Sequence, residues 1–257
     1  MTILEMSLNV VSRLLVGVVA VVIAGVGNAM AAENCRAGNY LYSITRDGDQ
    51  TGLLQLNVRD EGAFCRLKSR EWMQNDFFGV TQYCHYMERE ERWQGRELAV
   101  FQSDAYGWCS GLASTARPGA CKWPEDGKPL TVRAEMVGDR LRVNGLEFVA
   151  DPTEPFVTRN YMAPFFPGPN AFQVIDPIHG KLKAAKASRL DVTGPGSRYE
   201  IDGAGDRLLD YDQSGVLVKM RLTSDDVITE QVPLSTPYQK LLPEPGNEAC
   251  MAVLSRP

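Results

Sequence analysis

Residues Tyr40–Val58 read YLYSITRDGDQTGLLQLNV. Apolar and polar side chains alternate over 40–45 and again over 53–58, and the turn-forming run Arg46–Asp49 lies between these two segments. Alternation with a period of two is typical of a strand that buries one face, and Asp-Gly favours a tight hairpin turn. This stretch therefore predicts a β-hairpin.

The same pattern continues along most of the chain. Long strand signals run over Ala63–Met73 and Gly79–Arg92, and shorter ones cover 97–103, 130–137, 141–149, 182–192, 198–201, 207–211, 216–223 and 227–234. Short strands with Asp-Gly-type turns between them predict an antiparallel meander in a mainly β protein. The best helix candidate is Thr158–Ala163, and Pro164 limits its length.

Two segments interrupt the meander. Residues 104–128 contain two cysteines with several Gly and Pro residues, so they predict a long loop with its own disulfide. Residues 151–180 contain six prolines around Tyr161, Phe165, Phe166 and Phe172. We expect this Pro-rich, aromatic segment to cross the sheet, where it could either cover one of its faces or lead into a second half. A linker between domains would be more polar, so residues 32–257 predict a single antiparallel β domain.

Residues 1–31 have the features of a secretory signal peptide. Leu14–Gly27 is apolar and uncharged, Arg13 precedes it, and Ala29–Ala31 forms an A-x-A cleavage signal. An uncleaved membrane anchor is the alternative, but the apolar run is shorter than the ~18–20 residues that a span needs. We therefore expect cleavage after Ala31, a periplasmic or secreted location, and a mature chain that is not an integral membrane protein.

Cysteines are the second indication of export. The chain has six of them, at Cys35, Cys65, Cys84, Cys109, Cys121 and Cys250. An even number in an exported chain favours disulfides. A cysteine metal site is the alternative, but no C-x-x-C pair is present.

The spacing of the cysteines suggests three pairs. Cys109 and Cys121 would close a short loop. Cys65 and Cys84 are equidistant from Gln74–Asn75, so a hairpin turn at that point would place the two cysteines opposite each other. Cys35 and Cys250 remain, and a bond between them would tie the two ends of the chain together.

Composition and motifs exclude several classes of function. The net charge of −5 and pI near 5.2 leave no basic surplus for a phosphate backbone, so we expect no nucleic-acid partner. Only two histidines are present, and no nucleotide-binding G-x-x-x-x-G-K or G-x-G-x-x-G or nucleophile-elbow G-x-S-x-G motif occurs. We therefore predict no cofactor, no metal and no assignable catalytic residue.

Residues Tyr83–Trp93, YCHYMEREERW, hold the densest group of polar and aromatic side chains. In a strand, one face would carry Tyr83, His85, Met87, Arg89, Glu91 and Trp93, and the other Cys84, Tyr86, Glu88, Glu90 and Arg92. His85 and Met87 could bind a soft metal, whereas His85 and Glu91 would lie ~20 Å apart, too far for an acid/base pair. The alternative is a cross-strand ladder of charges and aromatic rings.

Several of these segments resemble a family of exported bacterial proteins known only as a domain of unknown function. The resemblance spans 40–234 and rests on Tyr40–Val58, on YCHYMEREERWQGRELAVFQS at 83–103, on Ile175, Asp176 and Gly180, and on LLDYDQSGVLVKMRL at 208–222. It implies a curved antiparallel sheet, a half-open barrel or lipocalin-like sheet similar to those of envelope lipid-handling proteins. It implies no established activity, and this chain departs from the family pattern at Cys65, Cys84, Cys109 and Cys121.

Aromatic residues supply the candidate binding site. A curved sheet under the Pro-rich segment would form an apolar pocket. The candidate ligand-binding residues are Trp72, Phe77, Phe78, Tyr83, His85, Tyr86, Trp93, Tyr161, Phe165 and Phe166. The alternative interpretation is that these residues form the core of the domain.

Three functions remain open at this stage. The first is a non-catalytic protein that binds an apolar small molecule, a lipid or an envelope partner protein, and it predicts a cavity of ~300 Å³ or more lined by these aromatic residues. The second is a hydrolase that uses carboxylates or Tyr in the same cleft, and it predicts titratable groups with opposed pKa shifts in that cleft. The third is a structural subunit of an extracytoplasmic complex.

Overall fold

The computed structural model of the chain describes residues 35–77, 80–109, 129–149, 151, 153–161, 171–224 and 226–237. These residues form fifteen strands and no helix. The strands are β1 (Gly38–Arg46), β2 (Asp49–Asp60), β3 (Cys65–Phe77), β4 (Val80–Gln94), β5 (Glu97–Cys109), β6 (Leu130–Val137), β7 (Arg140–Val143), β8 (Leu146–Val149), β9 (Phe156–Thr158), β10 (Ala171–Ile175), β11 (Leu182–Leu190), β12 (Ser197–Asp202), β13 (Arg207–Tyr211), β14 (Leu217–Leu222) and β15 (Val227–Val232).

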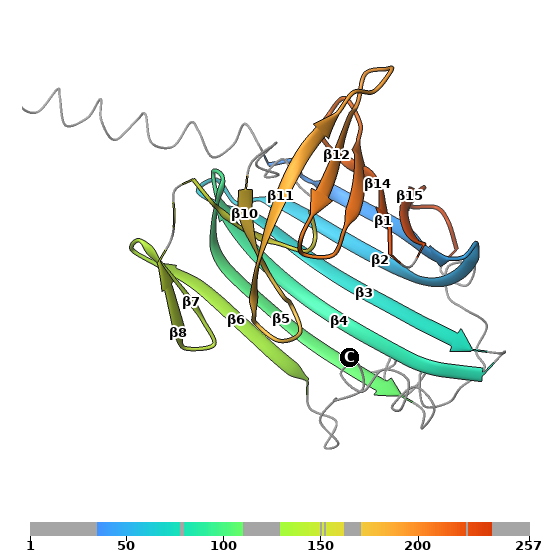
Figure 1. The fold of residues 1–257 in the computed structure, drawn as a ribbon, viewed down its shortest axis with the longest axis horizontal. Coiled ribbons are helices and arrows are strands. Elements are labelled where there is room, and N and C mark those ends of the chain that lie inside the picture. Colours follow the sequence, from blue (N-terminus) through green and yellow to red (C-terminus); the bar gives the residue numbers. More distant parts are fainter. Residues whose placement is uncertain are drawn as a thin grey trace, which may run out of the picture.

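All fifteen strands belong to one curved sheet (Figure 1). Their order is β8-β7-β6-β5-β4-β3-β2-β1-β15-β14-β13-β12-β11-β10-β9. The chain runs outward from β1 to β8 at one edge, crosses to β9 at the other edge, and returns through β15, which pairs with β1. Neighbouring strands are antiparallel except β9 and β10, which are parallel. The predicted antiparallel meander is therefore confirmed, with one crossover at the Pro-rich segment.

The two faces of the sheet differ in burial, as β4 shows. His85, Met87, Arg89, Glu91 and Trp93 are buried, and we call the face that carries them the inner face. The alternate residues form the outer face, where Tyr86, Glu88 and Glu90 are half-buried and Arg92 is exposed. The predicted separation of these side chains into two sets is confirmed over residues 84–93, the part of β4 whose side chains are described.

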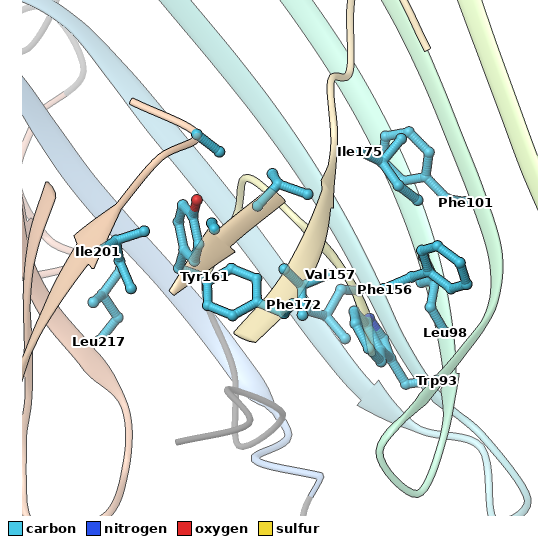
Figure 2. Close-up of a cluster of buried hydrophobic side chains, with 14 of the residues drawn as sticks. Trp93, Leu98, Phe101, Phe156, Val157, Tyr161, Phe172, Ile175, Ile201 and Leu217 are labelled. Carbon is cyan, nitrogen blue, oxygen red and sulfur yellow. The ribbon is translucent and has the colours of Figure 1, made fainter. Parts of the chain in front are cut away.

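The inner faces of the N-terminal half (β1–β8) and the C-terminal half (β9–β15) pack against each other. Figure 2 shows side chains from β4, β5, β9, β10, β12 and β14 in this contact, and all of them belong to one buried cluster. The labelled members are Trp93, Leu98, Phe101, Phe156, Val157, Tyr161, Phe172, Ile175, Ile201 and Leu217. Each large apolar side chain contributes ~1.5–3 kcal/mol on burial, so this core holds the two halves together.

The helix predicted at Thr158–Ala163 is wrong in its described part. Thr158 is the last residue of β9, and Arg159–Asn160 form a turn. Phe156–Thr158 pair in parallel with Gln173–Ile175 of β10. This pairing satisfies the backbone groups that a helix would satisfy internally, and it depends on a strand distant in sequence.

The structure corrects the predicted disulfide pattern. Cys35 is bonded to Cys65, so neither the Cys65–Cys84 bond nor the Cys35–Cys250 bond is formed. The β3–β4 hairpin turns beyond Phe77, not at Gln74–Asn75, and its register places Trp93 opposite Cys65. Cys84 is also disulfide-bonded. The side chain of Cys109, together with Cys121 and Cys250, lies outside the described residues, so the predicted Cys109–Cys121 bond stays a prediction.

Candidate functional site

The inner face of β3 and β4 carries a compact group of charged side chains, which we call the Glu71 cluster: Ser69, Glu71, His85 and Arg89. One carboxylate oxygen of Glu71 lies 3.1 Å from Nε2 of His85, and the other accepts a 2.6 Å hydrogen bond from Nη2 of Arg89. Nε of Arg89 also donates to Oγ of Ser69 at 3.1 Å. The register explains this grouping, because Met87 stands opposite Glu71 and leaves His85 and Arg89 as its diagonal neighbours.

Charge pairing controls the ionisation of Glu71. Burial alone would raise the pKa of its carboxyl group, but attraction to Arg89 and the hydrogen bond with His85 outweigh burial and lower this pKa to about 2. The side chain of Glu71 keeps 22% of its surface exposed, whereas that of Arg89 keeps only 4%. The Glu71 cluster is therefore an ionised, internally paired group whose carboxylate is its most accessible part.

A second buried carboxylate, Glu91, connects β4 to the crossing segment. One of its oxygens accepts a 2.9 Å hydrogen bond from Nε1 of Trp93. The other accepts hydrogen bonds from Oγ1 of Thr158, at 2.8 Å, and from Nδ2 of Asn160. Burial raises the pKa of Glu91 against the opposing effect of these donors. Glu91 is 1% exposed, so it holds β9 against the sheet and is not accessible to a substrate.

Arg207 contributes a buried cation from the C-terminal half. Its guanidinium lies 5.5 Å from the ring centroid of Tyr161 and donates to the carbonyl oxygens of Ala204, at 2.9 Å, and Gly205, at 2.6 Å. Burial lowers the pKa of Arg207, while the negative charge of Glu71 acts to raise it. Positive charges from both halves of the sheet therefore act on the carboxylate of Glu71.

Acid/base catalysis by the two inner-face carboxylates is not supported by their geometry. Burial raises the pKa of Glu91, and pairing with Arg89 and His85 lowers the pKa of Glu71, so the shifts are opposed. However, the register places Glu91 opposite Leu67, four residues along β3 from Glu71. This offset corresponds to ~13 Å along a strand, more than the ~5–9.5 Å that separates working carboxylate pairs.

No metal site is found among the described residues, and the groove that they form has no aromatic walls. No group of three or more His, Cys, Asp or Glu side chains there is arranged to hold a metal ion. A groove of about 410 Å³ lies on the outer face of β13–β15, and its walls are Asp210, Val218, Lys219, Glu230, Gln231, Val232 and Pro233. None of these is a predicted ligand-binding residue, so the aromatic-lined cavity stays a prediction. No helix in the described part of the chain is long and apolar enough to span a bilayer.

The predicted ligand-binding residues do not all share one face. His85, Trp93 and Tyr161 lie in the interior between the two halves, whereas Trp72 and Tyr86 are cross-strand partners on the outer face. Phe77 and Tyr83 lie in β3 and β4, but their side chains, together with Phe78, Phe165 and Phe166, are outside the described residues.

Sequence reasoning missed the residues that surround the inner-face charges. Glu71, Ser69, Thr158, Asn160 and Arg207 were not among the candidates. A signal for Glu71 is present, because Ser69, Glu71 and Met73 share one face of a strand in a segment expected to pair with 79–92. Knowing the register of that hairpin would have placed Glu71 beside His85 and Arg89.

The described residues are all-β, with one large open sheet whose inner face buries charged side chains that pair with one another. The chain belongs to the family DUF6134, a domain of unknown function, whose model matches residues 42–231. The expected membership in a family known only as a domain of unknown function is therefore confirmed.

The chain also has a match among solved structures. The chain is similar to the crystal structure of a β-barrel-like protein of domain of unknown function DUF1849 from Brucella abortus. The two are 9% identical, with a TM-score of 0.49, and the similarity covers 77% of this chain and 97% of that one. No curated protein matches the chain.

Proposed function

We propose that the mature chain is an exported, non-catalytic protein that binds an apolar small molecule or lipid on the inner face of its sheet. The observation that supports this is a continuous row of inner-face residues that crosses the strands from β5 to β12. In order, the row consists of Gly107, His85, Met73, Gly52, Ile44, Thr229, Met220, Leu209 and Tyr199.

This row combines apolar chemistry with access to solvent. Met73, Met220 and Tyr199 are partly exposed although they pack against the main core. Methionine side chains are flexible and polarizable, so they adapt to apolar ligands of different shape. Gly52 adds no side chain to the row, and no larger residue fits there, because a Cβ would lie 2.0 Å from the carbonyl oxygen of Trp72.

The Glu71 cluster lies beside this row. Glu71 and Met73 are successive inner-face residues of β3, and His85 belongs to both the row and the cluster. An apolar surface next to one partly exposed, charge-paired carboxylate suits a ligand with an apolar body and a small polar end. The charges of Glu71 and Arg89 balance each other, so the cluster needs no charged ligand. Its exposed carboxylate edge can orient the polar end of the ligand by hydrogen bonding alone, with no chemical step.

Probe binding to two matched variants tests the proposal. Purified mature chain should bind the apolar fluorescent probe phenylnaphthylamine saturably, and Met220→Lys should abolish this by placing a charge on the row. Leu208→Lys is the matched control, because Leu208 is also half-buried but lies on the outer face of neighbouring β13. No saturable binding by the parent chain, or equal loss in both variants, would overturn the proposal.

Protein purified from the host distinguishes ligand binding from the alternative function, that of an accessory to an envelope protein. Native mass spectrometry of protein from the host's envelope should show an apolar small molecule or lipid at a fixed stoichiometry. A bound protein in its place would favour the envelope-accessory function. Export is tested on the same sample, because N-terminal sequencing should begin at Ala32, and a chain that retains residues 1–31 would contradict cleavage.

A further inference from the structure

A band of apolar side chains is buried on the outer face of β15, β1, β2, β3 and β4. We call it the outer-face band: Leu41, Leu53 and Trp72 are buried, and Tyr86 and Val232 pack against them while partly buried. Leu41 is 2% exposed, and Leu53 and Trp72 are each 7% exposed. These side chains are separate from the main core and point to the other side of the sheet.

The register gives the band a direction. Val232 stands opposite Leu41 on β1, Leu53 stands opposite Trp72, and Trp72 stands opposite Tyr86 on β4. Cys84 is the next outer-face residue of β4 beyond Tyr86, and it is fully buried and disulfide-bonded. The band therefore runs diagonally from the end of the last described strand to a buried disulfide.

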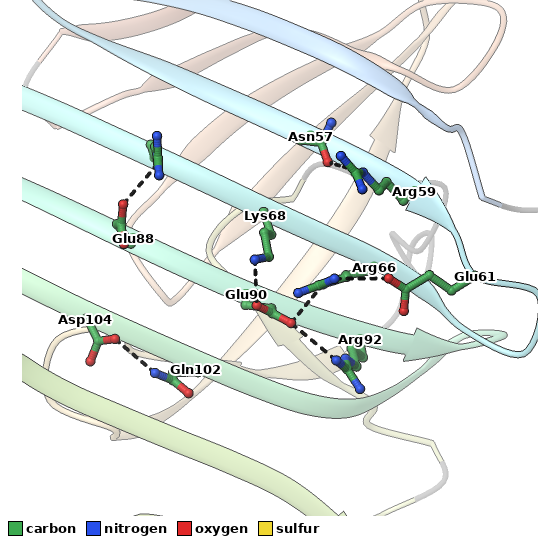
Figure 3. Close-up of polar contacts among 11 residues, drawn as sticks. Asn57, Arg59, Glu61, Arg66, Lys68, Glu88, Glu90, Arg92, Gln102 and Asp104 are labelled. Carbon is green, nitrogen blue, oxygen red and sulfur yellow. Dashed lines mark hydrogen bonds and ion pairs between the residues drawn. The ribbon is translucent and has the colours of Figure 1, made fainter. Parts of the chain in front are cut away.

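Charged and polar side chains that pair with one another lie elsewhere on this face (Figure 3). Glu90, for example, forms ion pairs with three cations: Arg66 at 2.9 Å, Lys68 at 3.3 Å and Arg92 at 3.6 Å. The two halves of the sheet pack against each other on the opposite, inner face, where β5 also contacts β9. The outer-face band is therefore buried on the face that lies away from the packing of the two halves.

We propose that the C-terminal segment 238–257 docks on the outer-face band and that Cys250 is the disulfide partner of Cys84. When this bond forms, the two thiols lose two protons and two electrons. A disulfide of the extracytoplasmic compartment accepts them by thiol–disulfide exchange and is reduced to a dithiol. The segment carries apolar residues that match the band, at Leu241, Leu242, Met251, Val253 and Leu254.

The length of the segment fits this path. The described chain ends at Pro237, just beyond Val232 at the start of the band. From β15 to β4 the chain must cross four strand spacings, ~19 Å, and move ~13 Å along the strands. The residues from Pro237 to Cys250 can extend to ~43 Å, so they reach Cys84 with length to spare.

The other two cysteines fit this bond less well. Cys109 stands opposite Tyr83 in the β4–β5 register, out of phase with Cys84. Cys121 is the other candidate partner for Cys84, but a bond from Cys121 to Cys109 would close a short loop within one segment. Docking of residues 238–257 would place a strap over the β1–β15 seam, where the two halves of the sheet join.

Non-reducing tryptic mapping of the exported protein tests the proposal directly. Cys84 lies in peptide 71–89, Cys250 in peptide 241–257, and both Cys109 and Cys121 in peptide 97–122. The expected result is a cross-linked pair of 71–89 with 241–257 and an internally bonded 97–122. A cross-link between 71–89 and 97–122 would overturn the proposal.

Two serine variants give an independent measurement. Each is denatured in the presence of a maleimide, so every free thiol is labelled whether or not the variant folds. Cys250→Ser should label peptide 71–89, whereas the matched control Cys121→Ser should label only 97–122. Label on 71–89 in the Cys121→Ser variant, or its absence in the Cys250→Ser variant, would contradict the Cys84–Cys250 bond.

Discussion

Glu71 is the residue on which the inner-face charges depend. It is the common partner of Arg89 and His85, and its charge also acts on Arg207 from the opposite half. The sequence predicted that His85 and Arg89 share a face, but not that Glu71 joins them. The reason is that a diagonal cross-strand contact depends on register, which the spacing along one strand does not contain.

At the residue scale we expect Glu71→Gln to reduce stability in a pH-dependent way. The pKa of Glu71 is lowered to about 2 in the folded chain, below its unfolded value of 4.5, so its contribution is complete above the unfolded pKa and is lost as pH falls through the folded one. At neutral pH the substitution leaves buried Arg89 without its counter-charge, which costs ~3–5 kcal/mol at most. Urea unfolding across acidic and neutral pH measures both effects.

The control for Glu71 is Glu230→Gln. Glu230 pairs with Lys219 at 3.5 Å, and both side chains are exposed, so its loss should cost no more than ~1 kcal/mol. If Glu71→Gln and the parent chain lose stability equally as the pH falls from neutral, Glu71 is not the group that carries this pH dependence.

At the scale of elements, the short strand β9 depends on a side-chain anchor. It contains only Phe156–Thr158, and Glu91 of β4 accepts hydrogen bonds from Thr158 and from Asn160 in the following turn. Proline content predicted the crossing segment correctly. It did not predict a strand inside the segment, because that strand forms only when β10 and Glu91 are in place.

We expect Thr158→Val to destabilise the protein by ~1.5–3 kcal/mol, since it removes a donor to a buried carboxylate at nearly constant volume. Thr131→Val is the matched control, because the 2.6 Å hydrogen bond from Thr131 to Asp104 is exposed, and its loss should cost within ~0.5 kcal/mol. Chemical denaturation of both variants gives the comparison, and equal losses would show that Glu91 does not anchor β9.

At the scale of the whole molecule, the two halves share one core and should unfold together. Phe172 of β10 is fully buried between them. Phe172→Ala should therefore cost ~3–5 kcal/mol and lower a single transition seen by both circular dichroism and tryptophan fluorescence. Phe148→Ala, at the partly buried edge strand β8, is the control with a smaller expected loss. Separate transitions for the two probes would contradict a shared core.

The local features of this protein can be predicted from its residues alone. Period-two alternation and Asp-Gly turns predicted the strands, the meander and the two faces of β4, because these features arise within a few residues of each other. The three-dimensional fold was needed to show that Cys65 pairs with Cys35, that Glu71 joins Arg89, that Trp72 and Trp93 lie on opposite faces, and that Thr158 ends a strand. The physical reason is that register and long-range pairing are set by the packing of residues distant along the chain, and a local pattern carries no record of those contacts.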